Sequence, residues 1–295
     1  MKIEILDNCP ACNSVAIEKY TDIPDFYFSK EVFPVFQCCN CGLKFTQNRP
    51  AEEEIGRYYD SANYASHDSE KKQNLFSIVY KSARDYMLGQ KFQLIRQFIP
   101  EWQKVLDYGT GEGTFTEYLL KKGLDAEGIE PSELARDNFK SRTGKTLYPN
   151  LISLPAGKEY DAISMWHVLE HIHQLRDTME KLVSVLRKKG VMAIAVPNQN
   201  SIDSREFGVH WAAWDVPRHL YHWNLESLST FMENLGMKQV YCGQLPLDPF
   251  YIGMISARYE NKNPVGGILK GLRSYLHGKK HPSEGSTLLT IWMKP

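Results

Sequence analysis

One glycine-rich loop constrains the fold of this chain more than any other sequence feature. Asp107, Gly109, Gly111 and Gly113 stand where the apolar, strand-like segment 104–109 gives way to a helix-like segment. Glycines let a backbone turn sharply and approach a ligand closely, because no Cβ stands in the way. Open α/β sheets bind ligands at the carboxyl ends of their strands, which is where this loop lies. The pattern therefore predicts a ligand-binding α/β fold.

From residue 103 onward, strand-like and helix-like segments alternate. The predicted strands lie at 104–109, 126–131, 145–148, 161–166 and 190–197, with helices between them. Regular alternation with apolar strands is typical of a doubly wound, mostly parallel sheet. A helix at 224–236, the strand that follows it and a final strand at 286–295 complete the predicted Rossmann-like domain.

The ligand expected at the loop is S-adenosylmethionine and not a dinucleotide. The glycine spacing departs from the dinucleotide pattern G-x-G-x-x-G. Asp107 precedes the glycines and is unfavourable beside a pyrophosphate, but it suits a cationic ligand without phosphates. Glu130 ends the second predicted strand, where a carboxylate can accept hydrogen bonds from two ribose hydroxyls.

The motifs D-Y-G-T-G-E-G, G-I-E-P and W-H-V-L-E-H-I resemble those of class I S-adenosylmethionine-dependent methyltransferases. The segment D-V-P-R-H-L-Y-H at 215–222 resembles bacterial small-molecule methyltransferases, many of which also carry an N-terminal zinc ribbon. The resemblance covers roughly residues 5–260. It implies a seven-stranded sheet whose last strand is antiparallel. It also implies the cofactor-binding residues Asp107, Gly109, Thr110, Gly111, Gly113, Glu130, Pro131, Leu151 and Trp166. This chain departs from the family at Asn150, where an acidic residue usually stands near the adenine.

Five of the six cysteines fall in the first 41 residues. Cys9 and Cys12 form one C-x-x-C pair, and Cys38 and Cys41 form another. Four thiolates from two such pairs make a closed tetrahedral Zn²⁺ site, which holds structure and leaves no open position for chemistry. The alternatives are free structural thiols and a redox pair, although no βαβ pattern surrounds either pair. Cys39 is adjacent to a ligand and should point away.

The chain divides into three predicted parts. Residues 1–48 form the zinc ribbon, 49–102 a helical linker or cap, and 103–295 the methyltransferase domain. No secretory signal opens the sequence and no apolar run is long enough to cross a bilayer. We therefore expect the protein in the cytoplasm, where thiols stay reduced. The oligomeric state is not predicted.

Histidines cluster in two segments that follow predicted strands. Methyl transfer to a hydroxyl needs a base, and the ordinary pKa of histidine suits that role at neutral pH. The predicted catalytic residues are His167, Glu170, His171, His219 and His222. Glu170 and His171 can instead fix the loop by local hydrogen bonds. The same pair also resembles a divalent-metal site of ubiquinone-pathway O-methyltransferases.

Substrate contacts are predicted in the second histidine segment. Arg218 can bind a carboxylate or phosphate bidentately, and the rings of Trp214 and Tyr221 can stack on a ring or sugar face. The alternative is that these aromatic side chains pack a lid over the core.

Net charge is zero, with 35 Lys and Arg against 35 Asp and Glu, which argues against wholesale binding to nucleic acid. The insert 261–281 departs from this balance, because it holds five basic residues and no acidic one. Its apolar residues share one helical face: Ile268, Leu269, Leu272, Tyr275 and Leu276. Such a helix can make peripheral membrane contact, dock a dimer partner or cover the substrate site, but we favour a packed insertion.

The predicted function is S-adenosylmethionine-dependent methylation, O-directed, of a small molecule such as a sugar or biosynthetic intermediate. One alternative is an RNA methyltransferase that holds RNA with its ribbon. Residues 1–50 carry five basic and six acidic side chains, which is unfavourable for that role. The other alternative is a non-catalytic binding protein that retains the fold. No nucleic-acid partner is expected.

Overall fold

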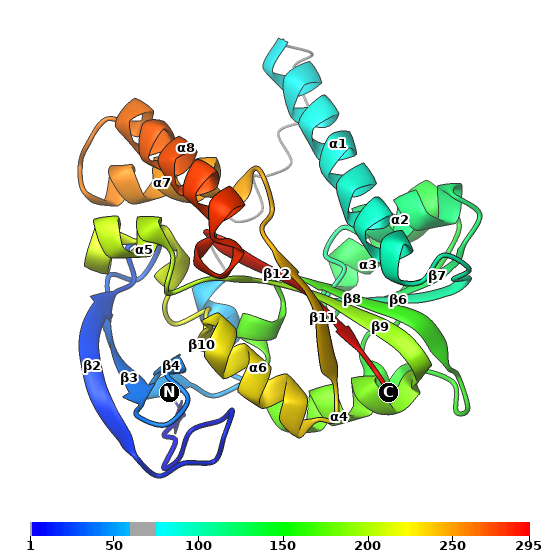
Figure 1. Ribbon diagram of the computed structural model, residues 1–295, viewed down its shortest axis with the longest axis horizontal. Helices are drawn as coiled ribbons and strands as arrows, with labels where there is room; N and C mark the ends of the chain where they lie inside the picture. The colour runs from blue at the N-terminus through cyan, green and yellow to red at the C-terminus, as the bar shows by residue number, and fades with distance from the viewer. Residues whose placement is uncertain (1, 60–74) are drawn as a thin grey trace.

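The computed structural model describes residues 2–59 and 75–295. Figure 1 shows a central sheet flanked by helices, with a smaller N-terminal sheet (blue) beside it. The predicted helical linker or cap, 49–102, contains η1 (Ile55–Tyr58) and α1 (Leu75–Phe98). Its residues 60–74 lie outside the described part of the chain. Within that part, no helix is both long and apolar enough to cross a membrane.

The central sheet has six strands in the order β11-β12-β9-β8-β6-β7. The pairs β6–β7, β6–β8 and β8–β9 are parallel, and β12 is antiparallel to both of its neighbours. The Rossmann-like fold with an antiparallel last strand is therefore confirmed. The bounds are β6 (Lys104–Tyr108), β7 (Asp125–Ile129), β8 (Tyr160–Trp166), β9 (Leu186–Pro197), β11 (Lys238–Gly243) and β12 (Thr287–Met293).

The expected seventh strand, at 145–148, is only a bridge. Tyr148 pairs with Ile129, and its N–H donates to the carbonyl of Gly128. Pro149 follows at once and has no N–H to extend the ladder, so the pairing stops after one residue.

The helix expected before β9 is shorter than predicted. It ends at Val185, and residues 186–189 belong to the strand. Lys294 donates from Nζ to the carbonyls of Val183 (2.7 Å) and Leu186 (2.6 Å), which satisfies carbonyls at the end of the helix. The side chain of Leu186 is fully buried, so a strand places it in the core.

Helices cover both faces of the sheet. Residues of α1 and α2 pack in one apolar cluster and residues of α4 and α6 in the other. Ser132 and Asn224 cap α3 and α6 with their side chains. The helices α5 and α7 were not predicted. The bounds are α2 (Thr114–Lys121), α3 (Glu133–Thr143), α4 (Leu175–Val185), α5 (Ile202–Phe207), α6 (Leu225–Asn234), α7 (Asp248–Tyr259) and α8 (Pro264–Lys280), with short 3₁₀ turns η3 (Leu151–Ser153), η4 (Leu169–His171), η5 (Gly208–His210), η6 (Ala212–Trp214) and η7 (Pro282–Glu284).

The N-terminal sheet is completed by a strand from the distant second half of the chain. Its order is β10-β4-β3-β2, and β10 (Tyr221–His222) pairs antiparallel with β4 (Lys44–Thr46). The hydroxyl of Thr46 also donates to the carbonyl of His219 at 2.8 Å. The remaining strands are β1 (Ile3–Glu4), β2 (Ile17–Pro24), β3 (Val32–Cys38) and β5 (Arg49–Pro50), of which β1 and β5 pair separately.

The two sheets share one apolar core. Leu43 and Phe45 of the N-terminal part belong to the same buried cluster as Leu106 and Ile163 of the central sheet. The pairing of β5 with β1 places residues 49 and 50 with the N-terminal part, beyond the expected boundary at 48. The N-terminal part is thus tied to the central sheet by packing and by main-chain hydrogen bonds.

Candidate active site

The glycine loop adopts a conformation that requires glycine at three positions. Gly109, Gly111 and Gly113 have φ of 70°, 56° and 71°, which is the left-handed region. A Cβ on Gly109 would come within 2.6 Å of the Val168 side chain, and a Cβ on Gly113 would overlap the ring of Phe139. A Cβ on Gly111 would meet nothing within 4 Å. The backbone at Gly111 therefore faces open space, where a ligand can approach it.

Glu130 lies beside this loop, as the sequence predicted. Its carboxylate accepts hydrogen bonds from the N–H groups of Gly111 (2.8 Å) and Ser132 (2.9 Å). The N–H groups of Gly109 and Thr110 both donate to the carbonyl of Ile129, which fixes the loop against the end of β7. A carboxylate has about four lone-pair sites, so two remain to accept from ribose hydroxyls.

Asp107 does not face the open side of the loop, which corrects its expected contact with a cationic ligand. The side chain is buried, and its two oxygens accept from the hydroxyls of Ser164 (2.6 Å) and Thr116 (3.0 Å). Burial raises the pKa of Asp107 to about 6, although the Ser164 hydroxyl and the charge of Lys91 lower it. The carboxyl group of Asp107 thus links β6 to β8 and to α2. These hydrogen bonds fix the end of β6, where the glycine loop begins.

Lys91 is a residue that the sequence reasoning missed. It comes from α1, and its Nζ lies 4.3 Å from the ring centroid of Trp166. Burial lowers the pKa of Lys91, while Asp107 and Asp248 raise it. The signal in the sequence is a lysine on the apolar face of α1, spaced three and four residues from Leu88 and Ile95.

The expected adenine side of the site is occupied by the short turn η3. The side-chain oxygen Oδ1 of Asn150 accepts from the N–H (3.0 Å) and hydroxyl (2.9 Å) of Ser153. Asn150 therefore caps this turn, at the position where the chain departs from the acidic residue of the family it resembles. Leu151 packs partly against the core, and Pro131 is exposed at the end of β7.

His167 is held between two carboxylates in a left-handed conformation, with φ of 57°. Its Nε2 lies 2.9 Å from Asp248 and its Nδ1 lies 3.5 Å from Glu170. Burial alone would lower the pKa of His167, but the ion pair with Asp248 and the contact with Glu170 raise it to about 10. The ring is then protonated at neutral pH, which corrects its predicted role as a base.

Replacing Asp248 with asparagine is expected to lower the pKa of His167 by two or more units, toward the ordinary value near 6.5. The reason is that the asparagine keeps a hydrogen-bonding group but loses the charge. The measurement is an NMR titration of the His167 ring, assigned by its absence in His167→Gln. Asp177→Asn, in the first turn of α4, is the control. A pKa still near 10 in Asp248→Asn would show that Glu170 alone holds the proton.

Glu170, His171 and His219 form a cluster of proton acceptors. Their ligand-type atoms all lie within 4.8 Å of one another. Nδ1 of His171 lies 3.0 Å from the carbonyl of Arg218, and Nδ1 of His219 lies 2.8 Å from that of Ala213. A carbonyl only accepts, so donation to it places the hydrogen on each Nδ1 and leaves the lone pair on each Nε2. The hydroxyl of Tyr59 also lies 3.0 Å from Nδ1 of His171, where it accepts from the same N–H.

The carboxylate of Glu170 is fully buried, and neither oxygen has a hydrogen-bond partner among the described residues. Burial raises the pKa of Glu170, but His167 and the two neighbouring histidines lower it below its ordinary value. Burial and His219 lower the pKa of His171 to about 4. The carboxylate of Glu170 and Nε2 of His171 are thus unprotonated at neutral pH and lie beside His219, an arrangement that can take up a proton or hold a divalent cation.

Arg218 does not line an open substrate site, which corrects its predicted role. It is buried, and its Nη2 lies 2.8 Å from Asp25 of the N-terminal part and 2.7 Å from Asp215. Its Nη1 also donates to the carbonyl of Tyr58 at 3.2 Å. The guanidinium is used to join the N-terminal part to the 215–222 segment.

The other predicted substrate contacts and one predicted base are buried in the same packing. Trp214 and Tyr221 are buried, and the hydroxyl of Tyr221 accepts from Arg49 at 3.2 Å. His222 is also buried, and its Nε2 lies 3.2 Å from the hydroxyl of Thr46. Burial and the nearby His219 lower the pKa of His222 well below its usual value. These three positions therefore support the fold and do not face an acceptor.

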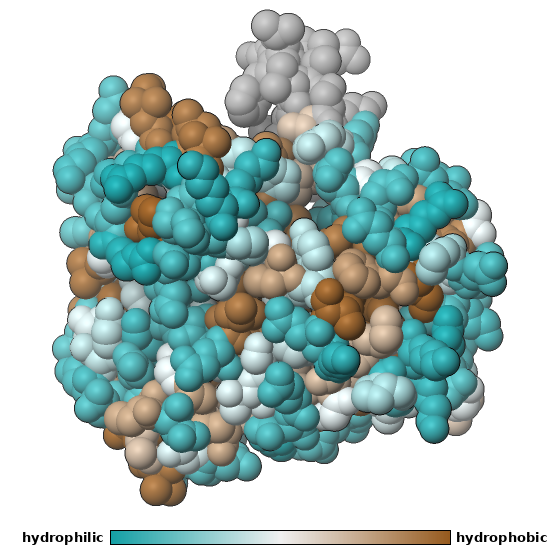
Figure 2. Space-filling view, viewed as in Figure 1, coloured by the Kyte–Doolittle hydropathy of each residue, from teal (hydrophilic) through white to brown (hydrophobic). Residues whose placement is uncertain are grey.

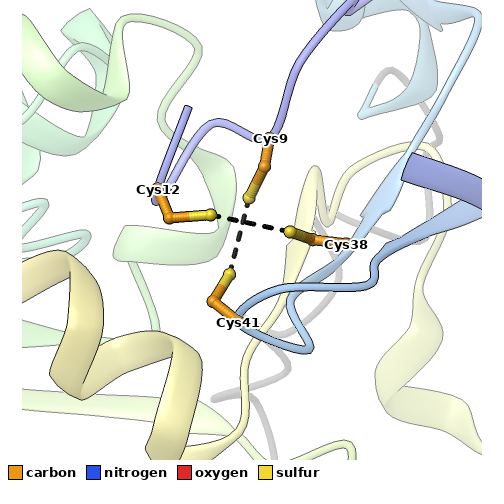
Figure 3. Close-up of side chains that lie close together, drawn as sticks. All are labelled: Cys9, Cys12, Cys38 and Cys41. Atoms are coloured by element: carbon orange, nitrogen blue, oxygen red, sulfur yellow. Dashed lines mark hydrogen bonds between the residues drawn. The ribbon is translucent and has the colours of Figure 1, made fainter. Parts of the chain in front are cut away.

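The four cysteines of the two C-x-x-C pairs converge on one point (Figure 3). Cys9 and Cys41 have sulfurs 3.6 Å apart, and so do Cys12 and Cys38. Sulfurs about 2.3 Å from a central Zn²⁺ would be about 3.8 Å apart in a tetrahedron, so the observed set fits that ion. A disulfide would need sulfurs about 2 Å apart. Cys39 is exposed, as expected.

A family model described as "Methyltransferase domain" matches residues 80–241, which is more than half of the chain. The chain is 23% identical over 133 residues to a ubiquinone biosynthesis O-methyltransferase of Bradyrhizobium diazoefficiens, covering 41% of this chain and 51% of that protein. It is 29% identical over 104 residues to the protein of the same name from Pelagibacter ubique, covering 32% and 42%. The chain thus spans about half the length of the curated relatives it matches.

Among solved structures, the chain is similar to one in the complex between the Haloferax volcanii Trm112 methyltransferase activator and a methyltransferase. The TM-score is 0.53 at 18% identity, and the match covers 73% of this chain and 92% of that one. At this identity the similarity shows the fold.

Proposed function

The chain belongs to the methyltransferase-domain family, and we propose that it transfers the methyl group of S-adenosylmethionine to a hydroxyl of a small molecule, such as a sugar or biosynthetic intermediate. Members of this family are methyltransferases, and we take the methyl donor to be S-adenosylmethionine. The observation that supports a hydroxyl acceptor is the cluster of Glu170, His171 and His219, because it offers a buried place for a proton. Both curated relatives are also named O-methyltransferases.

The residues around the glycine loop have the chemistry needed to hold the cofactor. Glu130 would accept from the ribose hydroxyls, and the backbone at Gly111 leaves room for close approach. The ammonium of Lys91, next to Trp166, would pair with the cofactor's carboxylate. Pro131 and Leu151 would flank the adenine. When bound, the cofactor supplies an electrophilic methyl group on a sulfonium, and the chain's own residues position it and exclude water.

His171 is the residue we propose as the base. As the methyl carbon leaves sulfur and bonds to the acceptor oxygen, the hydroxyl proton passes to Nε2 of His171. The carbonyl of Arg218 holds Nδ1–H of the same ring and so fixes its orientation. The carboxylate of Glu170 then stabilises the imidazolium that forms, as a buried carboxylate does in other catalytic triads. His219 lies against the same ring, with centroids 4.7 Å apart, and is the second candidate for this proton.

The four-cysteine cluster is proposed to bind one structural Zn²⁺, so that residues 1–48 form a zinc ribbon. The distances between the sulfurs support this assignment. Three of the four cysteines are buried, and with four protein ligands the ion has no open position for a substrate. The ribbon and the methyltransferase domain, 103–295, are proposed to act as one unit, since Arg218 and β10 join them.

The test of the proposed function follows labelled methyl groups from S-adenosylmethionine into a bacterial extract that is then separated into small molecules, RNA and protein. Label is expected in the small-molecule fraction and to be stable to mild acid and base, as in an ether. His171→Asn is expected to lower kcat roughly a hundredfold or more while leaving cofactor affinity unchanged. His281→Asn, exposed and distant in sequence, is the control. Label confined to RNA would contradict the proposal.

A further inference from the structure

Helix α8, the insert predicted to pack on the body of the protein, presents its large apolar side chains outward. Val265, Leu269 and Leu276 are each more than half exposed, and Ile268 and Leu272 are 41% exposed. Figure 2 shows hydrophobic surface gathered in the upper left, where Figure 1 places α8. These positions recur every three or four residues and therefore form one stripe along the helix.

The opposite face of α8 consists of small residues, and that face packs inward. Gly267, Gly271 and Gly278 are buried, as is Ser274. A Cβ on Gly267 would overlap the backbone of Gly253 in α7, and a Cβ on Gly271 would overlap the carbonyl of Pro249. The two helices can therefore approach closely only with glycines between them. This packing is what leaves the leucines on the outside.

Basic side chains lie along the edges of the apolar stripe. Lys279 and Lys280 are exposed, and neither has a carboxylate within ion-pair distance among the described residues. Arg273 pairs with Glu206 at 2.6 Å but remains 70% exposed. Lys262 and Lys270 share Glu260. The helix itself contributes no acidic side chain to its surface.

We propose that α8 lies on an anionic lipid bilayer, with its apolar stripe in the boundary between headgroups and acyl chains. A helix with apolar residues on one side and lysines at the edges binds such a surface through both burial and charge. Long basic side chains reach the lipid phosphates while the leucines enter the bilayer. A protein partner fits less well, because lysine is depleted from protein interfaces.

The bilayer contact is independent of the chemistry proposed above, so the two can fail separately. It has one structural link to the site, since α7 packs against α8 through Gly253 and begins at Asp248, the partner of His167. A bilayer bound at α8 would therefore lie on the helix pair that borders the candidate active site.

The test is co-sedimentation of the full chain with vesicles of phosphatidylcholine alone or mixed with phosphatidylglycerol. We expect binding to the anionic vesicles that weakens with added salt. Leu269→Gln with Leu276→Gln is expected to lower the partition coefficient at least tenfold, because two exposed leucines no longer enter the bilayer. Leu134→Gln, 69% exposed on α3, is matched to Leu269 at 63% and should bind like the wild type.

Lys279→Gln with Lys280→Gln should reduce binding to anionic vesicles and flatten its dependence on salt. Light scattering of the same proteins gives their oligomeric state. Vesicle binding that the leucine variant retains would overturn the proposal, as would no binding to either vesicle. A dimer that the leucine variant dissociates, without vesicle binding, would overturn it in favour of a second copy of this chain.

Discussion

Replacing Cys9 with serine is expected to remove the Zn²⁺ proposed at the four-cysteine cluster and to unfold much more than the N-terminal part of the chain. Cys9 is fully buried in the apolar cluster that also contains Leu106 and Ile163 of the central sheet. Apparent binding energies of structural zinc sites, about 10 kcal/mol or more, are comparable with the whole stability of a typical domain. The thermal midpoint should therefore fall by more than about 10 °C, or no folded protein should be recovered.

The measurement combines elemental analysis, which should give one zinc per wild-type chain, with thermal unfolding. Cys39→Ser is the matched control, since Cys39 is adjacent to the proposed ligand Cys38 but is exposed. It should keep both the metal and the thermal midpoint. A Cys9→Ser protein that retains one zinc per chain and wild-type stability would refute the four-cysteine site.

Replacing Glu130 with alanine is expected to weaken cofactor binding roughly a hundredfold or more. A carboxylate that accepts from two hydroxyls contributes about 1.5–3 kcal/mol per hydrogen bond. The variant also loses the contacts to the N–H groups of Gly111 and Ser132, so the loop is less well fixed. Calorimetry with S-adenosylhomocysteine measures the affinity without turnover.

Glu130→Gln is a milder change than Glu130→Ala. Its amide oxygen can still accept one hydrogen bond, but the negative charge and the second acceptor oxygen are lost. It should bind with an affinity between those of the wild type and the alanine variant. Glu133→Ala, in the first turn of α3, is the control for a lost carboxylate nearby. Wild-type affinity in Glu130→Ala would contradict the assignment of this residue to the ribose.

The sequence predicted a residue's place in the fold best where that place follows from its neighbours along the chain. The glycines of the loop and Glu130 each follow a strand that its composition reveals, and parallel strands bring their ends together. The two C-x-x-C pairs likewise specify their own local geometry. Each of these motifs can be recognised from a short stretch of sequence, and the fold brings the motifs together.

The sequence predicted least where a role depends on a partner far along the chain. Arg218 reads as an anion-binding residue, but Asp25 lies against it only because the ribbon packs on the second half. His167 reads as a base, and the carboxylate of Asp248 that keeps it protonated comes from a helix that was not predicted. The residue type limits which interactions a side chain can make. Which of them it makes depends on the partner that the fold brings to it.

Helix α8 illustrates a further limit. Its apolar residues do lie on one face of the helix, as the periodicity predicts. Periodicity does not show which face packs against the rest of the protein. A face of leucines and a face of glycines can each pack, and here close approach to α7 favours the glycines. The expected packing of the insert is present, but the glycine face makes it and the apolar face stays exposed.

The pairing of β4 with β10 has a consequence for the order of events during synthesis. Residues 1–50 leave the ribosome long before residues 221 and 222 exist, so β4 emerges as an unpaired edge strand. An open edge is a site for mispairing with another nascent chain. Pairing across so long a sequence separation is slow to form, because the intervening loop must first be closed. Metal binding by the cysteines can order the early segment locally, whereas its last hydrogen bonds wait for the arrival of β10.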